Sequence, residues 1–266
     1  MITLCLIYLF LILPRLKNKN DLDNFKKQIF AHRGFHNIKK EIPENSTAAF
    51  TRALAMGYGI EIDVHLTKDK RLVVFHDHSL LRVCNAPGEI EDYTFSELKN
   101  LRLLDTKETI PSLEEVLALI NGQVPLLLEL KSVGTSTTLC SYVAEALSTY
   151  EGSVFIQSFS PLDLRWFKKH KPQYIRGQLS SDLVKTDQGR PLIPRFFLSH
   201  LLCNFLSRPD FISYHYKSLK PVSTFLLHRL FKVPYAVWTL RKKKDYQKLL
   251  KDYDFFIIED FEIMKK

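Results

Sequence analysis

The stretch that decides the fold is Gly59-Ile-Glu-Ile-Asp-Val64, which a short run around Lys68-Asp69-Lys70 joins to Arg71-Leu-Val-Val-Phe75. Both flanking runs are apolar and rich in β-branched residues, which is typical of strands. A connection this short cannot cross over between parallel strands, so the two runs are predicted to form an antiparallel hairpin. With the turn centred near Lys68-Asp69, residue 61 is expected to lie opposite residue 76.

Short apolar runs of the same kind recur along the chain, at 29–32, 125–130, 154–159, 174–179, 210–214, 234–240 and 254–258. Helix-start signals lie between several of them: Ser46 precedes an apolar helical face, Ser112 begins a capping box, and Ser160 precedes a proline. This alternation favours an α/β protein with mainly parallel strands. Without the return strand of the hairpin, eight strands remain. That number fits a closed (β/α)8 TIM barrel with a β-hairpin insertion after strand 2.

The composition places the chain among ordinary globular proteins. Its 266 residues are 45% hydrophobic and 25% charged, which excludes disorder, collagen and a simple coiled coil. Lys and Arg number 38 against 29 Asp and Glu, and the net charge of +9 suits an anionic small molecule or a membrane surface. No basic stripe with interleaved aromatics is present, so we expect no nucleic-acid partner. The four cysteines are widely spaced, which argues against a zinc site and a disulfide framework.

The N-terminal run Met1–Leu13 has only Thr3 as a clearly polar member. As a helix it would span about 20 Å, short of a hydrocarbon core of about 30 Å. Cations follow it at positions 15, 17 and 19, and no signal-peptide pattern is present. We therefore expect a short membrane anchor at 1–16, a polar linker at 17–27, and a single catalytic barrel at 28–266 on the cytoplasmic side. A misassigned start, or a helix buried on the domain, is the alternative.

Three polar clusters fall at predicted strand ends, where a barrel places its active site. They are His32-Arg33-Gly34, Glu61-x-Asp63 with His76-Asp77, and Glu129-x-Lys131. Residues i and i+2 of a strand face the same way, so Glu61 and Asp63 share one face. Two such carboxylates repel each other unless a charge neutralises them, and a divalent cation with oxygen ligands is the usual remedy. Taken singly, each group has a structural alternative, such as an ion pair or a core histidine.

Together these groups indicate phosphodiester hydrolysis. A divalent metal polarises a phosphate oxygen, Arg33 offers a planar fork of donors, and Lys131 adds a point charge. His32 and His76 can serve as base and acid, in either order. The chain has neither the G-x-x-x-x-G-K-[ST] nor the G-x-S-x-G motif, which excludes P-loop NTPases and α/β-hydrolases.

The ordered set of motifs resembles the glycerophosphodiester phosphodiesterases over about residues 28–260. The motifs are His32-Arg33-Gly34, Pro43-Glu44-Asn45-Ser46, Glu61-x-Asp63-Val64-x-x-Thr67-Lys68-Asp69, Phe75-His76-Asp77 and Glu129-Leu-Lys131. The resemblance implies a barrel of the phospholipase-C-like phosphodiesterase type that hydrolyses glycerophosphodiesters to glycerol 3-phosphate and an alcohol, in lipid and glycerol metabolism.

The resemblance also implies roles for individual residues. His32 and His76 are the acid–base pair. Glu61, Asp63 and Glu129 bind Mg²⁺ or Ca²⁺. Arg33 and Lys131 hold the phosphate, and the late position of Trp238 suits substrate contact or a plug of the barrel. Glu44 is expected to orient Arg33 or the metal shell, with a helix N-terminal acid as the alternative.

Two stretches depart from the family pattern: Leu240-Arg241 after Trp238-Thr239, and Glu259-Asp260 at the last strand. Both departures are expected to touch the substrate end, so the leaving alcohol stays open. A lysophospholipase D-like activity on membrane lysophospholipids and a catalytically silent barrel that binds lipid headgroups are the alternative functions. The apolar run 196–206 is either a barrel helix or a lipid-facing segment.

Overall fold

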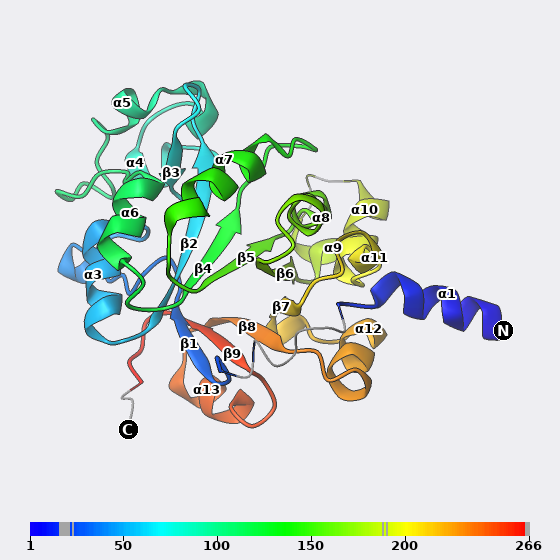
Figure 1. Cartoon of the computed structure of the whole chain (residues 1–266). Helices are drawn as coiled ribbons and strands as arrows, with labels where there is room; N and C mark the ends of the chain where they lie inside the picture. The colour runs from blue at the N-terminus through cyan, green and yellow to red at the C-terminus, as the bar shows by residue number, and fades with distance from the viewer. Residues whose placement is uncertain (16–21, 23, 188, 190, 264–266) are drawn as a thin grey trace. The chain divides into compact units, whose positions relative to one another are not determined.

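The computed structural model describes residues 1–15, 22, 24–187, 189 and 191–263. Within them the chain alternates strands and helices (Figure 1). The described strands are β1 Gln28–Ala31, β2 Gly59–Leu66, β3 Leu72–Val74, β4 Leu126–Leu130, β5 Val154–Ser158, β6 Ile175–Ser180, β7 Phe211–His215, β8 Tyr235–Leu240 and β9 Phe255–Ile258. Each falls on one of the runs that the sequence predicts as a strand.

The strands follow the order β1-β9-β8-β7-β6-β5-β4-β2-β3, and β1 also pairs with β2. With β3 set aside, the order of the other eight strands therefore closes on itself. The pairs β1–β2, β2–β4, β6–β7 and β7–β8 are parallel, and β2–β3 is antiparallel. The predicted eight-stranded parallel barrel and its hairpin insertion after the second strand are both confirmed.

The hairpin register differs by one residue from the prediction. Val64 pairs with Val74 and Leu66 with Leu72, so the turn centres on residue 69. Continuing this register places residue 76 opposite residue 62 rather than opposite residue 61. The cause is the turn: Lys70 adopts φ +62°, and the N–H of Thr67 donates to the carbonyl of Arg71. Three residues, 68–70, thus lie between the two residues that this hydrogen bond joins.

The longer helices are α1 Ile2–Ile12, α3 Thr47–Ala55, α6 Leu113–Ile120, α7 Thr138–Ala146, α8 Pro161–His170, α10 Leu192–Ser199 and α13 Lys243–Leu249. The shorter ones are α4 Leu81–Cys84, α5 Phe95–Leu98, α9 Leu183–Thr186, α11 Asn204–Ser207 and α12 Val222–Phe225. The three predicted caps are confirmed, because the hydroxyls of Ser46, Ser112 and Ser160 accept backbone N–H bonds at the starts of α3, α6 and α8. The run 196–206 lies in α10, α11 and the turn between them.

The chain divides into two compact units. The first comprises residues 29–155 and the segment from Ile258 onward, and holds all the predicted charged and histidine site residues. The second comprises residues 1–28 and 156–257, and holds Trp238.

In the second unit, the C-terminal end of α1 is docked. Ile12 is fully buried with Leu202 and Leu227, the side chain of Asn204 donates to the Ile12 carbonyl at 2.9 Å, and Arg208 donates to the Leu13 carbonyl at 2.8 Å. Among the described residues, no helix combines the length and apolar character needed to cross a bilayer. The predicted short membrane anchor at 1–16 finds no support among these residues. The predicted linker at 17–27 lies mostly outside the described residues.

Candidate active site

Three carboxylates converge in the first unit. Glu61 and Asp63 lie on β2 with the expected shared face, and the parallel register pairs Asp63 with Glu129 on β4. All three side chains belong to buried residues, and one oxygen from each lies within 4.8 Å of the others. The β2–β4 pairing, which the sequence alone does not reveal, is what brings Glu129 to the other two.

The charges of this cluster are only partly balanced. Burial and the charges of Asp63 and Glu129 raise the pKa of Glu61 well above its usual value. Burial also raises the pKa of Glu129, whereas Asp63 is kept ionised: Lys131, His76 and Arg33 hold its pKa well below the usual range despite its burial. The ammonium of Lys131 lies 2.9 Å from an Asp63 oxygen and also contacts Glu129.

A divalent cation fits this donor set. Hard cations take several oxygen ligands, and three buried carboxylates within reach of one point provide them. A neutral side chain lies beside these carboxylates: Asn45 donates its amide N–H to Asp63 at 2.9 Å. The buried carbonyl oxygen of the same amide has no hydrogen-bond partner among the described residues.

The turn after β1 places Arg33. Its backbone has φ +54°, and its N–H donates to Glu61 at 2.9 Å. The guanidinium donates to Glu44 at 2.8 Å and lies 3.7 Å from Asp63. Gly34 follows with φ +76°, and a Cβ there would lie only 2.8 Å from the Cβ of Ala49. Because it accepts this bond from the guanidinium, Glu44 orients Arg33, which is the first of the two roles predicted for Glu44.

His32 is held by Glu259, for which we predicted a different location. Its Nδ1 lies 2.8 Å from a carboxylate oxygen of Glu259, a residue that we expected at the substrate end. Burial lowers the pKa of His32 to about 4, although the hydrogen bond to Glu259 opposes this. The neutral ring then donates its Nδ1–H to Glu259, which leaves the Nε2 lone pair free of a proton. The barrel topology could have predicted this contact, because residue 259 directly follows β9, the strand next to β1 in the closed sheet.

A different carboxylate, that of Asp77, holds His76. Its Nδ1 lies 2.5 Å from Asp77, which accepts a hydrogen bond from Arg82 at 2.6 Å. Arg82 also donates to Glu44 at 2.7 and 3.0 Å, so a continuous chain of charges joins His76 to Arg33. Despite burial, the hydrogen bonds from His76 and Arg82 hold the pKa of Asp77 well below its usual value. Nothing in the sequence pattern singles out Arg82, because it lies in a four-residue helix of the insertion.

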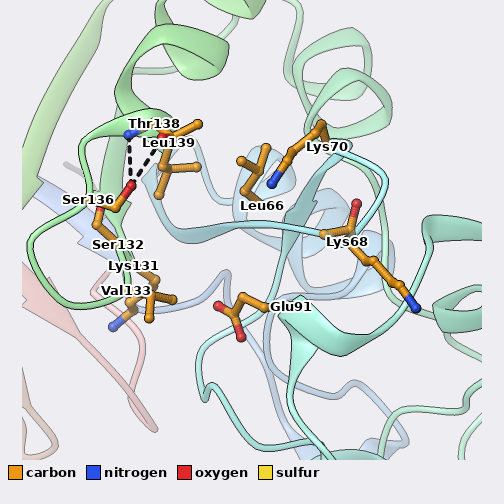
Figure 2. A pocket seen from close by; sticks show the side chains of 11 residues that line it. Leu66, Lys68, Lys70, Glu91, Lys131, Ser132, Val133, Ser136, Thr138 and Leu139 are labelled. Carbon is orange, nitrogen blue, oxygen red and sulfur yellow. Dashed lines mark hydrogen bonds between the residues drawn. The ribbon is translucent and has the colours of Figure 1, made fainter.

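A pocket of about 240 Å³ opens beside Lys131 (Figure 2). Lys131, Ser132 and Val133 line it from the end of β4, and Leu66, Lys68 and Lys70 line it from the hairpin. Glu91, which no sequence motif singles out, lines the same pocket.

Trp238 lies on β8, in the second unit. Its ring meets Phe159 edge-on at 6.0 Å and lies 5.3 Å from the ring of His215. Its indole nitrogen is buried and has no hydrogen-bond partner among the described residues. A contact of Trp238 with substrate stays a prediction.

The chain resembles known proteins in sequence and in fold. The chain matches the model of the glycerophosphoryl diester phosphodiesterase family over residues 32–256. A glycerophosphodiester phosphodiesterase of Bacillus altitudinis is 38% identical over 169 residues, which are 59% of this chain and 68% of the relative. One of Caldanaerobacter subterraneus is 38% identical over 167 residues, which are 58% of this chain and 67% of the relative.

A solved phosphodiesterase of Oleispira antarctica, in complex with the product sn-glycerol-3-phosphate, resembles the chain with a TM-score of 0.72 and 25% identity, over 89% of this chain and 94% of that one. The match to the family spans most of the chain and includes all the carboxylates and histidines predicted for the site. The chain therefore belongs to the glycerophosphoryl diester phosphodiesterase family.

Proposed function

We infer that the protein is a metal-dependent hydrolase that cleaves glycerophosphodiesters to glycerol 3-phosphate and an alcohol. The observation that carries this inference is the convergence of Glu61, Asp63 and Glu129 within 4.8 Å, in the same unit as two histidines that carboxylates orient. Relatives named as glycerophosphodiester phosphodiesterases at 38% identity support it, as does the solved relative that holds sn-glycerol-3-phosphate.

We propose that Glu61, Asp63 and Glu129 hold Mg²⁺ or Ca²⁺, with the free oxygen of Asn45 as a further ligand. Both ions prefer oxygen, which is all that these four side chains present to a cation. When bound, the ion polarises a phosphate oxygen and offsets negative charge as it builds up during the reaction.

The chain's own groups then divide the remaining work. Arg33 and Lys131 bind the phosphate, with Glu44 and Asp63 fixing their positions. We propose that neutral His32 accepts the proton of the glycerol 2-hydroxyl at Nε2 as that oxygen attacks phosphorus. His76 donates a proton to the departing alcohol. In the second half the proton movements reverse: His76 takes a proton from water, which opens the cyclic phosphate, and His32 returns its proton to the 2-hydroxyl.

Release of glycerol 3-phosphate from glycerophosphocholine, measured with and without chelator, tests this function. We expect chelation to abolish release and added Mg²⁺ or Ca²⁺ to restore it. His32→Ala and His76→Ala should each lower kcat by about 10²-fold or more, whereas His170→Ala, on the exposed end of α8, should not. Product formation that chelator leaves unchanged would refute the metal's role.

We further propose that the second unit rests on an anionic lipid surface, which would bring lysophospholipids within the substrate range. Residues 156–257 contain 19 Lys and Arg against seven Asp and no Glu. All but three of the exposed large apolar side chains that the structure describes belong to this unit, on α1, α10 and the segment 222–230. Apolar side chains combined with positive charge are typical of proteins that lie on anionic membranes without crossing them.

Cosedimentation with vesicles of phosphatidylcholine, alone or mixed with phosphatidylglycerol, tests this placement. We expect binding that requires the anionic lipid, weakens with salt and drops for the double variant Ile193→Ser/Phe225→Ser. Ile38→Ser, an exposed apolar site in the other unit, is the control. Equal recovery with both vesicle types, or no binding, contradicts the proposal. Faster turnover of lysophosphatidylcholine than of glycerophosphocholine would favour the lysophospholipase D-like alternative.

A further inference from the structure

A second group of metal-ligating side chains lies in the first unit, apart from the three carboxylates. His65 is on β2, His78 follows β3, and Glu91 lies in the short 3-10 helix Ile90–Asp92. The Nδ1 atoms of His65 and His78 lie 3.1 and 3.0 Å from the same carboxylate oxygen of Glu91. The two rings meet edge to face, with centroids 4.8 Å apart. Three separate segments thus bring two imidazole nitrogens and one carboxylate oxygen together.

Contacts at both ring nitrogens orient His65. The residue is fully buried, and both ring nitrogens face oxygen: Nδ1 faces Glu91, and Nε2 lies 3.3 Å from the carbonyl of His76. With a cation bound to Nδ1, the Nε2–H of the ring donates to this carbonyl. Metal-bound histidines commonly use their second nitrogen in this way.

The spacing also suits a small ion. Bonds of 2.0–2.1 Å in a tetrahedral site separate neighbouring ligand atoms by about 3.3 Å, close to the 3.0 and 3.1 Å found here. The second oxygen of Glu91 is buried and has no hydrogen-bond partner among the described residues. Glu91 also lines the pocket of about 240 Å³ beside Lys131 (Figure 2).

We propose that His65, His78 and Glu91 bind a divalent transition-metal ion, with Zn²⁺ as the best fit, at a site separate from the catalytic cation. Imidazole nitrogen selects zinc and its neighbours over Mg²⁺ and Ca²⁺, which take oxygen. The wide cysteine spacing does not bear on this site, because no thiolate takes part. The bound ion fastens the insertion that carries Glu91 onto β2, and through the His65–His76 contact it steadies the backbone of His76.

The test is Zn²⁺ binding by the full chain in excess Mg²⁺, which occupies the oxygen site. Metal retained after gel filtration is measured, with the Co²⁺ visible spectrum as a second readout. We expect one tightly held Zn²⁺ per chain, intense visible bands of four-coordinate Co²⁺, and a rise in Tm of roughly 5 °C with Zn²⁺. All three should be lost in His78→Ala and in Glu91→Gln. These side chains are partly exposed, so the variants should fold, which their metal-free Tm verifies.

His170→Ala removes an exposed histidine of the other unit and should keep the ion. Zinc retained equally by wild type and His78→Ala, or not retained by wild type, overturns the proposal. Loss of the ion in His170→Ala would place the nitrogen ligands elsewhere and overturn it too. Because neither metal retention nor the Co²⁺ spectrum depends on turnover, failure here is distinguishable from failure of the proposed hydrolase function.

Discussion

Glu259 is the residue whose role the structure changes most. It accepts the Nδ1–H of His32 at 2.8 Å, and so fixes the tautomer that leaves Nε2 able to accept a proton. Glu259→Gln keeps the size of the side chain but removes its charge, and its amide can present N–H instead of oxygen to the ring. We expect kcat for glycerol 3-phosphate release to fall roughly 10- to 100-fold, with KM little changed.

The matched control for Glu259→Gln is Glu262→Gln, the same substitution three residues later. Glu262 is exposed and pairs with Arg52 at 3.1 Å, away from His32. Its kcat should equal that of wild type. If both variants lose activity alike, or neither does, Glu259 does not position the base.

The pH profile of kcat/KM tests the protonation state of His32. Burial lowers the pKa of this imidazole to about 4, so its neutral form predominates at every pH above that value. A base must be unprotonated, and activity is therefore lost as pH falls through the pKa. At saturating Mg²⁺ we expect little change between pH 7 and pH 5 and a decline near pH 4. An acid limb centred near pH 6.5, the ordinary value for histidine, would contradict the assignment.

The short helix α4 matters because its Arg82 joins two parts of the site. Arg82 bonds to Asp77, which holds His76, and to Glu44, which holds Arg33. Arg82→Lys keeps the charge but cannot supply the planar set of donors. We expect roughly tenfold lower kcat/KM. The Tm should change little, because Arg82 is half exposed and exposed ion pairs contribute little to stability. The control is Arg71→Lys, whose exposed guanidinium pairs loosely with Glu114 at 3.9 Å.

The turn between β1 and α3 depends on Gly34. Any other residue would have to adopt φ +76° and place its Cβ 2.8 Å from Ala49. Gly134 separates these two effects, since it has φ +59° but open space around the added Cβ. We expect Gly134→Ala to lower the free energy of unfolding by ~1 kcal/mol and Gly34→Ala by about 2–4 kcal/mol, measured by urea denaturation. Equal losses would show that the close contact with Ala49 can relax.

At the scale of elements, the sequence predicted every strand because apolar β-branched runs are local signals. The three helix caps were predictable for the same reason. The predicted hairpin register was wrong by one residue. The left-handed conformation of Lys70 lengthens the turn, and the residue types of the turn do not predict that conformation. Arg82 and Glu91 were missed because their roles depend on side-chain contacts across the insertion, which no spacing along the chain encodes.

For the whole molecule, the carboxylates could be foreseen because barrel topology sends the C-terminal ends of parallel strands to one place. The packing of the N-terminal helix was less predictable. A run of apolar residues does not reveal that Ile12 docks into a core built by residues 201–235. The net charge of +9 likewise does not reveal how charge is distributed along the chain, since residues 156–257 alone hold a surplus of twelve positive charges.

Metal binding should stabilise the whole molecule, because folding assembles three carboxylates whose burial and mutual repulsion raise the pKa of Glu61. An ion that binds only the folded chain adds about 2.7 kcal/mol at 100 times its Kd. For a chain of this size that is a rise in Tm of roughly 5–8 °C. We expect this rise when Mg²⁺ is added to chelator-treated protein, measured by differential scanning calorimetry.

Glu129→Gln separates the ion's effect from a general effect of salt. The substitution removes one ligand and one repelling charge, so the metal-free variant should be no less stable than metal-free wild type, yet it should lose most of the response to Mg²⁺. Glu114→Gln, an exposed carboxylate on α6, should respond like wild type. If Mg²⁺ raises the Tm of all three proteins equally, the ion acts outside this cluster, and the cation that the hydrolysis requires must be held by other groups.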